Sequence, residues 1–256
     1  KNSNKKDLAL IVAPEKSICS AMFTKSKVRA SCIDICADRI KEKSGQIRAI
    51  LINSGHANAC VGELGRHDSL KLSKALSALL DFKDDEILIC STGVIGVPLP
   101  LSKILINLPS LVDKLESNNF KNASEAILTT DLRPKRIVIQ TNIDGRKITI
   151  AGFAKGSGMI YPNMATMLAF LTCDVGIEKS IWDQMIADAC QSSFNSISVD
   201  GETSTNDCFI GINSGSKIDY KFLATIREGV DYVCQYLAKS IARDGEGANC
   251  LLEISV

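Results

Sequence analysis

Residues 155–174, KGSGMIYPNMATMLAFLTCD, decide the fold of this chain because they join a glycine-rich turn to an apolar run. Gly156 and Gly158 permit positive φ angles and close backbone approach. Pro162 fixes its own φ angle and restrains the residue before it. The sequence therefore predicts a strained backbone at the Ala-Thr bond that ends at Thr166, directly before a strand of the core.

Outward from this stretch, short β-branched or apolar runs predict strands. The expected strands are Leu8–Ala13, Ile47–Ile52, Ile87–Cys90, Ile137–Ile143, Lys147–Phe153, Met167–Cys173, Cys208–Asn213 and Cys250–Val256. Asp144 and Gly145 stand between two alternating runs, which predicts a type I′ hairpin. The second strand of that hairpin leads directly into residues 155–174.

Apolar residues at spacings of three and four predict amphipathic helices in the rest of the chain. The expected helices are Val28–Lys43, Ser69–Phe82, Leu101–Leu115, Ser180–Phe194 and Phe222–Arg243. The mixture of a hairpin with helices favours an α+β layered fold over a doubly wound parallel sheet.

Composition excludes several classes of partner. The 256 residues suffice for one large domain or two small ones, and 45% are hydrophobic. The net charge is +1 and no basic stripe occurs, which argues against nucleic acid as a partner. No run approaches the roughly 20 apolar residues needed to cross a membrane. The apolar stretch that follows the basic N-terminus, Leu8–Ala13, is too short and strand-like for a signal peptide. Small molecules are the expected partners, and the expected location is the cytoplasm, or a plastid if a transit segment was lost.

Charge is distributed unevenly about Thr166. Residues 1–165 contain 24 Lys and Arg against 16 Asp and Glu, a net charge of +8. Residues 166–256 contain 6 against 13, a net charge of −7. The difference is compatible with two pieces that stay together after a cut, and equally with uneven decoration of one domain.

Familiar catalytic and metal sites do not match this sequence. The ten cysteines form no CxxC, and His56 and His67 are the only histidines, so we expect reduced thiols and no metal. The glycine-rich stretch lacks both GxxxxGK[ST] and a GxGxxG after a strand, so we expect no nucleotide cofactor. Neither GxSxG nor a cysteine-protease signature is present.

A nucleophile in this chain needs another base, and a threonine at a new N-terminus has one. Its own α-amino group, with a pKa of about 7.7 to 8.0, can accept the hydroxyl proton. The chain would have to cut itself between Ala165 and Thr166. Attack of the Thr166 hydroxyl on the preceding carbonyl gives an ester that water can open.

Ser91, Thr92 and Gly93 follow a predicted strand and have the composition of an oxyanion hole. A hydroxyl and an exposed backbone N–H could point together at one oxygen. Taken alone, Ser-Thr-Gly after a strand is more often a simple turn. Three further polar clusters lie beside apolar runs: Ile52–Gly62, Ile197–Cys208 and Ala242–Cys250.

Together these motifs resemble the ornithine acetyltransferase family, the glutamate N-acetyltransferases of arginine biosynthesis. The motifs are NSGHANACVG, STGVIG, TTDLRPK, AKGSGMIYPNMATML, SVDGETSTND and DGEGA, and they run in the family's order over essentially all 256 residues. The chain departs from the family at His56 and Val61, where Asn and Thr are usual. The resemblance implies an αββα-type sandwich with mixed sheets, the fold shared with self-processing aminopeptidases.

The resemblance also implies roles for particular residues. Family members cut themselves at the bond that corresponds to Ala165-Thr166, and Thr166 would become the N-terminal nucleophile. Thr92 would supply a hydroxyl and Gly93 a backbone N–H to the oxyanion.

Substrate-binding positions of the family fall on four places in this sequence. They match Lys155, Thr166, one threonine of the pair Thr129 and Thr130, and Glu246. Our hypothesis is that the Lys155 ammonium reads a substrate carboxylate and that the Glu246 carboxylate reads a substrate ammonium.

The implied reaction is ping-pong acetyl transfer through an acetyl-threonine ester, with N-acetylornithine as donor and glutamate as acceptor and with no cofactor. Whether acetyl-CoA is also a donor stays open. Residues 1–165 would form the alpha chain and residues 166–256 the start of the beta chain, with the family's C-terminal region missing, and the pieces would pair into a heterotetramer. The alternatives are a non-catalytic fragment or binding module of this fold and a self-processing aminopeptidase.

Overall fold

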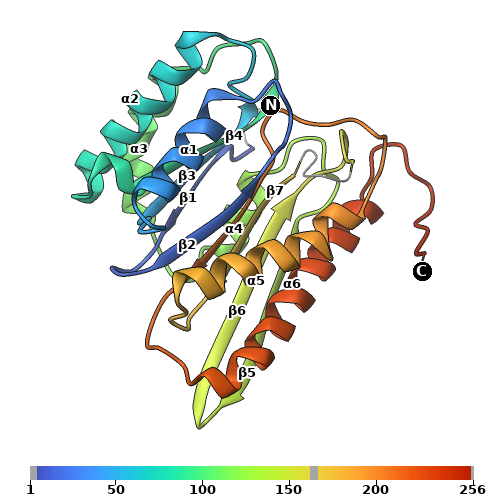
Figure 1. The fold of residues 1–256 in the computed structure, drawn as a ribbon. Coiled ribbons are helices and arrows are strands. Elements are labelled where there is room, and N and C mark those ends of the chain that lie inside the picture. Colours follow the sequence, from blue (N-terminus) through green and yellow to red (C-terminus); the bar gives the residue numbers. More distant parts are fainter. Residues whose placement is uncertain (1–4, 162–166, 255–256) are drawn as a thin grey trace.

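Two mixed β-sheets form the centre of the molecule, as Figure 1 shows. The structure is a computed structural model, and it describes residues 5–161 and 167–254. The smaller sheet has the order β1-β3-β4, with β1 at Leu8–Val12, β3 at Ala49–His56 and β4 at Ile87–Val94. β1 is antiparallel to β3, and β3 is parallel to β4.

The larger sheet has the order β2-β8-β7-β6-β5. Its strands are β2 (Ile18–Phe23), β5 (Lys135–Ile143), β6 (Arg146–Lys155), β7 (Leu168–Cys173) and β8 (Cys208–Asn213). β7 and β8 are parallel, and the other neighbours are antiparallel. Thus β6 ends just before the segment 162–166, and β7 begins just after it.

Helices pack around the two sheets (Figure 1). They are α1 (Ser31–Glu42), α2 (Glu63–Leu80), α3 (Leu101–Asp113), α4 (Phe120–Ala126), α5 (Lys179–Gln191) and α6 (Leu223–Arg243). α1 and α2 pack on β4, whereas α5 and α6 pack on the larger sheet. None of the helices in the described part of the chain is long and apolar enough to cross a membrane.

Apolar side chains fill the spaces between these layers. One core joins both sheets, with Ile52 of β3 in the same cluster as Phe170 of β7 and Ile210 of β8. A second core lies between the larger sheet and the two helices that cover it. Apolar residues of α6 at the predicted spacings of three and four form part of that second core. Leu223 is partly buried there, and Ile226, Val230, Val233, Leu237 and Ile241 are fully buried. The layered αββα fold predicted from the sequence is therefore confirmed.

The hairpin that leads to the glycine turn has the predicted geometry. Asp144 and Gly145 have φ angles of 53° and 74°, and Ile143 of β5 pairs with Arg146 of β6. Two consecutive positive φ angles are the mark of a type I′ turn. The turn therefore sets the register of β6, and this strand carries Lys155 at its end.

Several local predictions were wrong or incomplete. No strand forms over residues 250–254, and Leu252 and Ile254 are exposed. An alternating run becomes a strand only where a neighbouring strand offers its backbone, and none of the described strands pairs with this one. β2 and α4 were not expected, because ICSAMF has little alternation and FKNASEA has too few apolar residues.

Candidate active site

Two of the polar motifs meet where the parallel strands β3 and β4 end. Asn53 lies opposite Ser91, and the Ser91 hydroxyl donates to Asn53 Oδ1 at 2.6 Å. Gly55 lies opposite Gly93, so Ser-Thr-Gly continues the strand and does not form the turn that such a tripeptide usually makes. A Cβ atom on Gly93, whose φ angle is 128°, would lie 2.3 Å from the Gly55 carbonyl carbon. Only glycine fits this close approach of two backbones.

The end of β4 faces the end of β6 through two buried side chains. Lys155 Nζ donates to Thr92 Oγ1 at 3.4 Å, and both side chains are almost fully buried. The two residues lie 63 positions apart in the chain and on strands of different sheets, so the packing of one sheet on the other brings them together. A hydroxyl assigned to the oxyanion pair and a lysine assigned to substrate binding are therefore neighbours.

Acidic groups surround the Lys155 ammonium inside the protein. Burial lowers the pKa of Lys155, and the nearby Lys135 lowers it too, whereas the carboxylates of Asp131 and Asp207 oppose this shift. A buried ammonium is stable only with such partners. The two aspartates therefore belong to the site, although sequence reasoning did not assign them a role.

Asp131 fixes the first half of the glycine turn. Its Oδ1 atom accepts the Gly156 N–H at 2.7 Å and the Lys135 ammonium at 2.6 Å, and its Oδ2 atom accepts the Thr129 N–H at 3.1 Å. Burial alone would raise the pKa of Asp131, but Lys155, Lys135 and the Gly156 N–H together hold it below its usual value. Asp131 is therefore a carboxylate that anchors the turn. The charged residues of TTDLRPK were the available sequence signal.

The same lysine links this turn to the end of α6. Lys135 Nζ also donates to Asp244 Oδ2 at 2.6 Å, and this oxygen accepts the Leu132 N–H at 3.0 Å. Asp244 opens the DGEGA motif directly after the helix. The ion network thereby connects TTDLRPK, the glycine turn and DGEGA.

The second half of the glycine turn contacts Thr130 and Glu246. The hydroxyls of Thr130 and Ser157 lie 2.7 Å apart, and the Glu246 N–H donates to the Ser157 carbonyl at 2.6 Å. A Cβ atom on Gly158 would lie 2.7 Å from Glu246 Oε2. Glycine at this position therefore makes room for a carboxylate.

Positive φ angles in the turn differ from the prediction at one position. Gly156 has the predicted positive angle, 154°, but Gly158 does not, and the left-handed residue is Met159 at 56°. Asp200 accepts the Met159 N–H through one oxygen and the Ile160 N–H through the other at 2.9 Å. Hydrogen bonds from this carboxylate stabilise the unusual backbone at Met159.

Asp207 and Asn206 bring the SVDGETSTND loop to the same place. Asp207 Oδ1 accepts the Met167 N–H at 2.8 Å, just before β7. Asn206 Nδ2 donates to the carbonyls of Ala57 at 2.6 Å and Ser91 at 3.0 Å. The loop thus ties the start of β7 to the ends of β3 and β4.

The predicted cleavage position, Ala165 and Thr166, lies outside the described residues. Near the glycine turn, residues 156–159, the structure brings together the other predicted residues: Thr92, Gly93, Thr129, Thr130, Lys155 and Glu246. Thr129 reaches Asp131 through its main chain, whereas Thr130 contacts the glycine turn through its hydroxyl. No group of three metal-ligating side chains occurs in residues 5–161 and 167–254.

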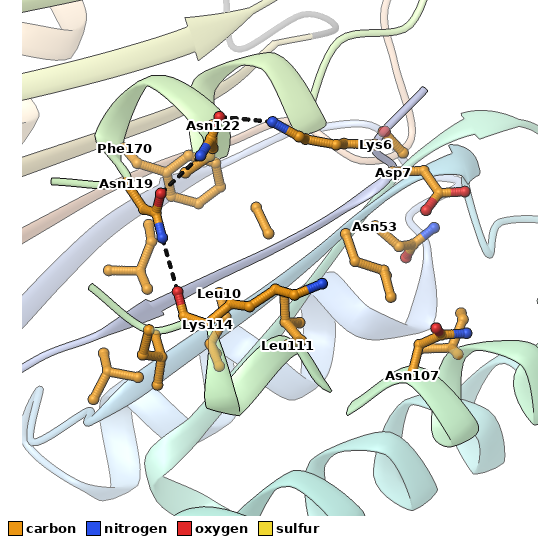
Figure 2. A pocket seen from close by; sticks show the side chains of 18 of the residues that line it. Lys6, Asp7, Leu10, Asn53, Asn107, Leu111, Lys114, Asn119, Asn122 and Phe170 are labelled. Carbon is orange, nitrogen blue, oxygen red and sulfur yellow. Dashed lines mark hydrogen bonds between the residues drawn. The ribbon is translucent and has the colours of Figure 1, made fainter. Parts of the chain in front are cut away.

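A separate groove of about 1180 Å³ borders this site. Figure 2 shows Leu10, Leu111 and Phe170 along it, with Lys6 bonded to Asn122 above them. The predicted substrate-binding residues do not line the groove, but Gly55, His56 and Val94 next to the oxyanion pair do.

Comparisons with known proteins identify the family of the chain. Residues 1–256 match the ArgJ family. The arginine biosynthesis bifunctional protein ArgJ of Prochlorococcus marinus subsp. pastoris is 66% identical over the whole of this chain. This chain covers 64% of that relative's length.

Solved structures share the fold. Ornithine acetyltransferase from Mycobacterium tuberculosis, solved in complex with ornithine, is 32% identical with a TM-score of 0.58, over 63% of this chain and 86% of that one. An aminopeptidase from Ochrobactrum anthropi with a variant of the Ntn hydrolase fold has a TM-score of 0.52 at 8% identity, over 94% of this chain and 74% of that one. This second likeness concerns the fold alone. On the family match over residues 1–256, the chain belongs to the ArgJ family.

Proposed function

We propose that this chain is part of a glutamate N-acetyltransferase that moves an acetyl group from N-acetylornithine to glutamate through an ester on Thr166. The observation that carries the proposal is the convergence of Thr92, Lys155 and Glu246 on the glycine turn that precedes Thr166. The M. tuberculosis relative, solved with ornithine, supports an amino-acid substrate of this class.

The site has the charges that such a reaction requires. In each half of the reaction an oxygen becomes negative, and the Thr92 hydroxyl with the Gly93 N–H would stabilise it. Donors placed for such an oxygen contribute about 100- to 1000-fold each to the rate. The nearby Lys155 ammonium adds positive charge in a buried site, where the effective dielectric constant is low.

Charged groups of the substrate would be bound at the two sides of the glycine turn. The Lys155 ammonium suits the carboxylate of an acetylated amino acid or of glutamate, and the exposed Glu246 suits the ammonium of ornithine. Which threonine of Thr129 and Thr130 contacts substrate is part of the proposal. The Thr130 hydroxyl already contacts the turn.

Self-cleavage before Thr166 belongs to the same proposal. Residues 1–165 make up 64% of the 256 residues of this chain. The ornithine acetyltransferase structure covers 63% of this chain. That agreement supports a relative in which the piece before the cut is a separate chain. The name of the Prochlorococcus relative, a bifunctional protein, supports acetyl-CoA as a second donor.

Intact mass and an acetyl-transfer assay test the proposal together. We expect the purified protein to contain two pieces that divide before Thr166, and to move acetyl from N-acetylornithine to glutamate. Thr166→Ala should give one uncut chain with no transfer, because the hydroxyl serves both steps, whereas Thr166→Ser keeps a hydroxyl and should retain both.

Two results would contradict the proposal. An uncut wild-type protein would exclude the N-terminal nucleophile. Hydrolysis of peptides without acetyl transfer would indicate an aminopeptidase, the second function known on this fold from the O. anthropi structure.

A further inference from the structure

Asp207 has a buried carboxylate oxygen whose role the proposed function does not explain. The side chain is 1% exposed, and Oδ2 has no hydrogen-bond partner among the described residues. Burying a carboxylate oxygen without a partner costs free energy, so such groups are rare unless they serve a function. The position is held firmly, because the Asp207 carbonyl also accepts the Thr24 N–H at 3.0 Å.

The carboxylate is held at the peptide bond that follows Thr166. Asp207 Oδ1 accepts the Met167 N–H at 2.8 Å, and the Met167 nitrogen is bonded covalently to the Thr166 carbonyl carbon. Only a few covalent bonds separate that nitrogen from the nitrogen and the hydroxyl of Thr166. The free oxygen therefore belongs to a carboxylate that is hydrogen-bonded to the residue directly after the proposed nucleophile.

The surroundings of Asp207 make it a stronger base than an ordinary aspartate. Burial raises its pKa well above the usual value, while the Ser204 side chain, the Met167 N–H and Lys155 oppose that shift. Lys155 faces it from β6, and the buried thiol of Cys208 adjoins it on β8. The pKa of Cys208 is itself raised, so this thiol stays neutral beside it.

Self-cleavage needs a proton acceptor that the acetyl-transfer step does not. After the cut, the α-amino group of Thr166 can take the hydroxyl proton. Before the cut, the same nitrogen is part of a peptide bond and has no basic lone pair. Another group must therefore accept the proton when the chain cuts itself.

We propose that Asp207 is the proton carrier of self-cleavage, and this inference rests on the proposed function. As the Thr166 oxygen bonds to the Ala165 carbonyl carbon, its proton passes to the Asp207 carboxylate. The bond from that carbon to the Thr166 nitrogen then breaks, and the nitrogen takes the proton back from Asp207. Water hydrolyses the resulting ester, which leaves a carboxylate on Ala165 and a free hydroxyl on Thr166.

Asp207→Asn is the test variant, because it keeps the size of the side chain and an oxygen for the Met167 N–H but cannot carry a proton. The rate of cleavage is measured on freshly translated protein over a range of pH. For the wild type we expect a rate that rises with pH, since more Asp207 becomes ionised as pH passes through its raised pKa. For Asp207→Asn we expect cleavage at least ~100-fold slower, with that pH dependence lost.

Asp174→Asn is the matched control. Asp174 Oδ1 accepts the Thr149 N–H at 2.8 Å at the other end of β7, so it makes the same kind of bond away from the site. We expect this variant to cut at the wild-type rate with the wild-type pH profile. Equal cleavage by Asp207→Asn and the wild type would overturn the inference and leave the proposed function standing. Failure of the wild type to cut would instead contradict the proposed function.

A stability measurement tests the raised pKa of Asp207, on which the expected pH profile of cleavage depends. The Thr166→Ala variant, which stays uncut, is made with either Asp or Asn at position 207. The free energies of unfolding of these two proteins are compared over a range of pH. A folded carboxyl with a raised pKa binds more protons than the unfolded chain, so it loses stability as pH rises from its unfolded pKa, near 3.8, through its folded pKa. The protein with Asn at position 207 should therefore become more stable relative to the protein with Asp as pH rises over that range. A constant difference would overturn the inference.

Discussion

Among single residues, Gly93 shows how closely the site depends on backbone contact. Gly93 has a positive φ angle, and the neighbouring strand β3 leaves no space for a side chain at this position. Gly96 offers a comparison three residues later, because it has a φ angle of 79° and nothing within 4 Å of its Cβ position. Glycine is thus needed at one position for space and conformation and at the other for conformation alone.

Gly93→Ala should lower the free energy of unfolding by about 2 to 4 kcal/mol, from backbone strain and overpacking together. Gly96→Ala should cost about 1 kcal/mol, because only its left-handed backbone is strained. Urea unfolding of the two variants measures the difference. Equal losses would show that the β3 backbone moves away from Gly93 without cost.

At the scale of elements, the junction of β5, the glycine turn and α6 depends on buried charges. Lys135 lies between Asp131 and Asp244, and all three side chains are almost fully buried. Breaking such a network leaves a buried charge without its partner, which costs more than the intact network contributes. The junction therefore holds the glycine turn in register with the end of the helix.

Asp244→Ala should lower the free energy of unfolding by about 2 to 4 kcal/mol, because Lys135 loses one partner and the Leu132 N–H loses its acceptor. Asp188→Asn is the control, since Asp188 pairs with Arg227 on the surface. An exposed pair contributes about 0 to 1 kcal/mol. Thermal unfolding of both variants checks this order, and a smaller loss for Asp244→Ala would show that the junction is not a support of the fold.

Across the whole molecule, the two expected pieces are interleaved. β7 and β8 belong to residues 166–256, and they lie in the larger sheet between β2 on one side and β6 on the other. Both cores also combine side chains from the two pieces. The charges of +8 and −7 on the pieces are therefore a minor reason for them to stay together.

After cleavage, the pieces should remain associated in strong salt, because backbone hydrogen bonds and buried apolar surface hold them and salt screens neither. Size-exclusion chromatography of the cut protein at low and high salt tests this. We expect both pieces to elute together at every salt concentration and to separate only in denaturant. Separation in salt alone would mean that charge attraction dominates.

The sequence predicted local structure well where neighbours in the chain determine it. The α6 stripe and the turn at Asp144 and Gly145 were predicted from spacing and turn chemistry. The strand predicted at Cys250–Val256 does not form over residues 250–254, because strand pairing depends on a partner that the local pattern does not reveal. The short helix α4 went unpredicted because it has too few apolar residues, although its Phe120 packs against the core.

The candidate site divides in the same way. Motifs and family resemblance by themselves determined the family, the layered fold and the residues proposed to act, because those signals lie in consecutive residues. Only the tertiary structure decided that Thr92 meets Lys155 and that Glu246 fills the space beside Gly158. It alone also revealed the unpaired oxygen of Asp207. Burial and the resulting pKa depend on groups brought from distant parts of the chain, and no local pattern of residues specifies them.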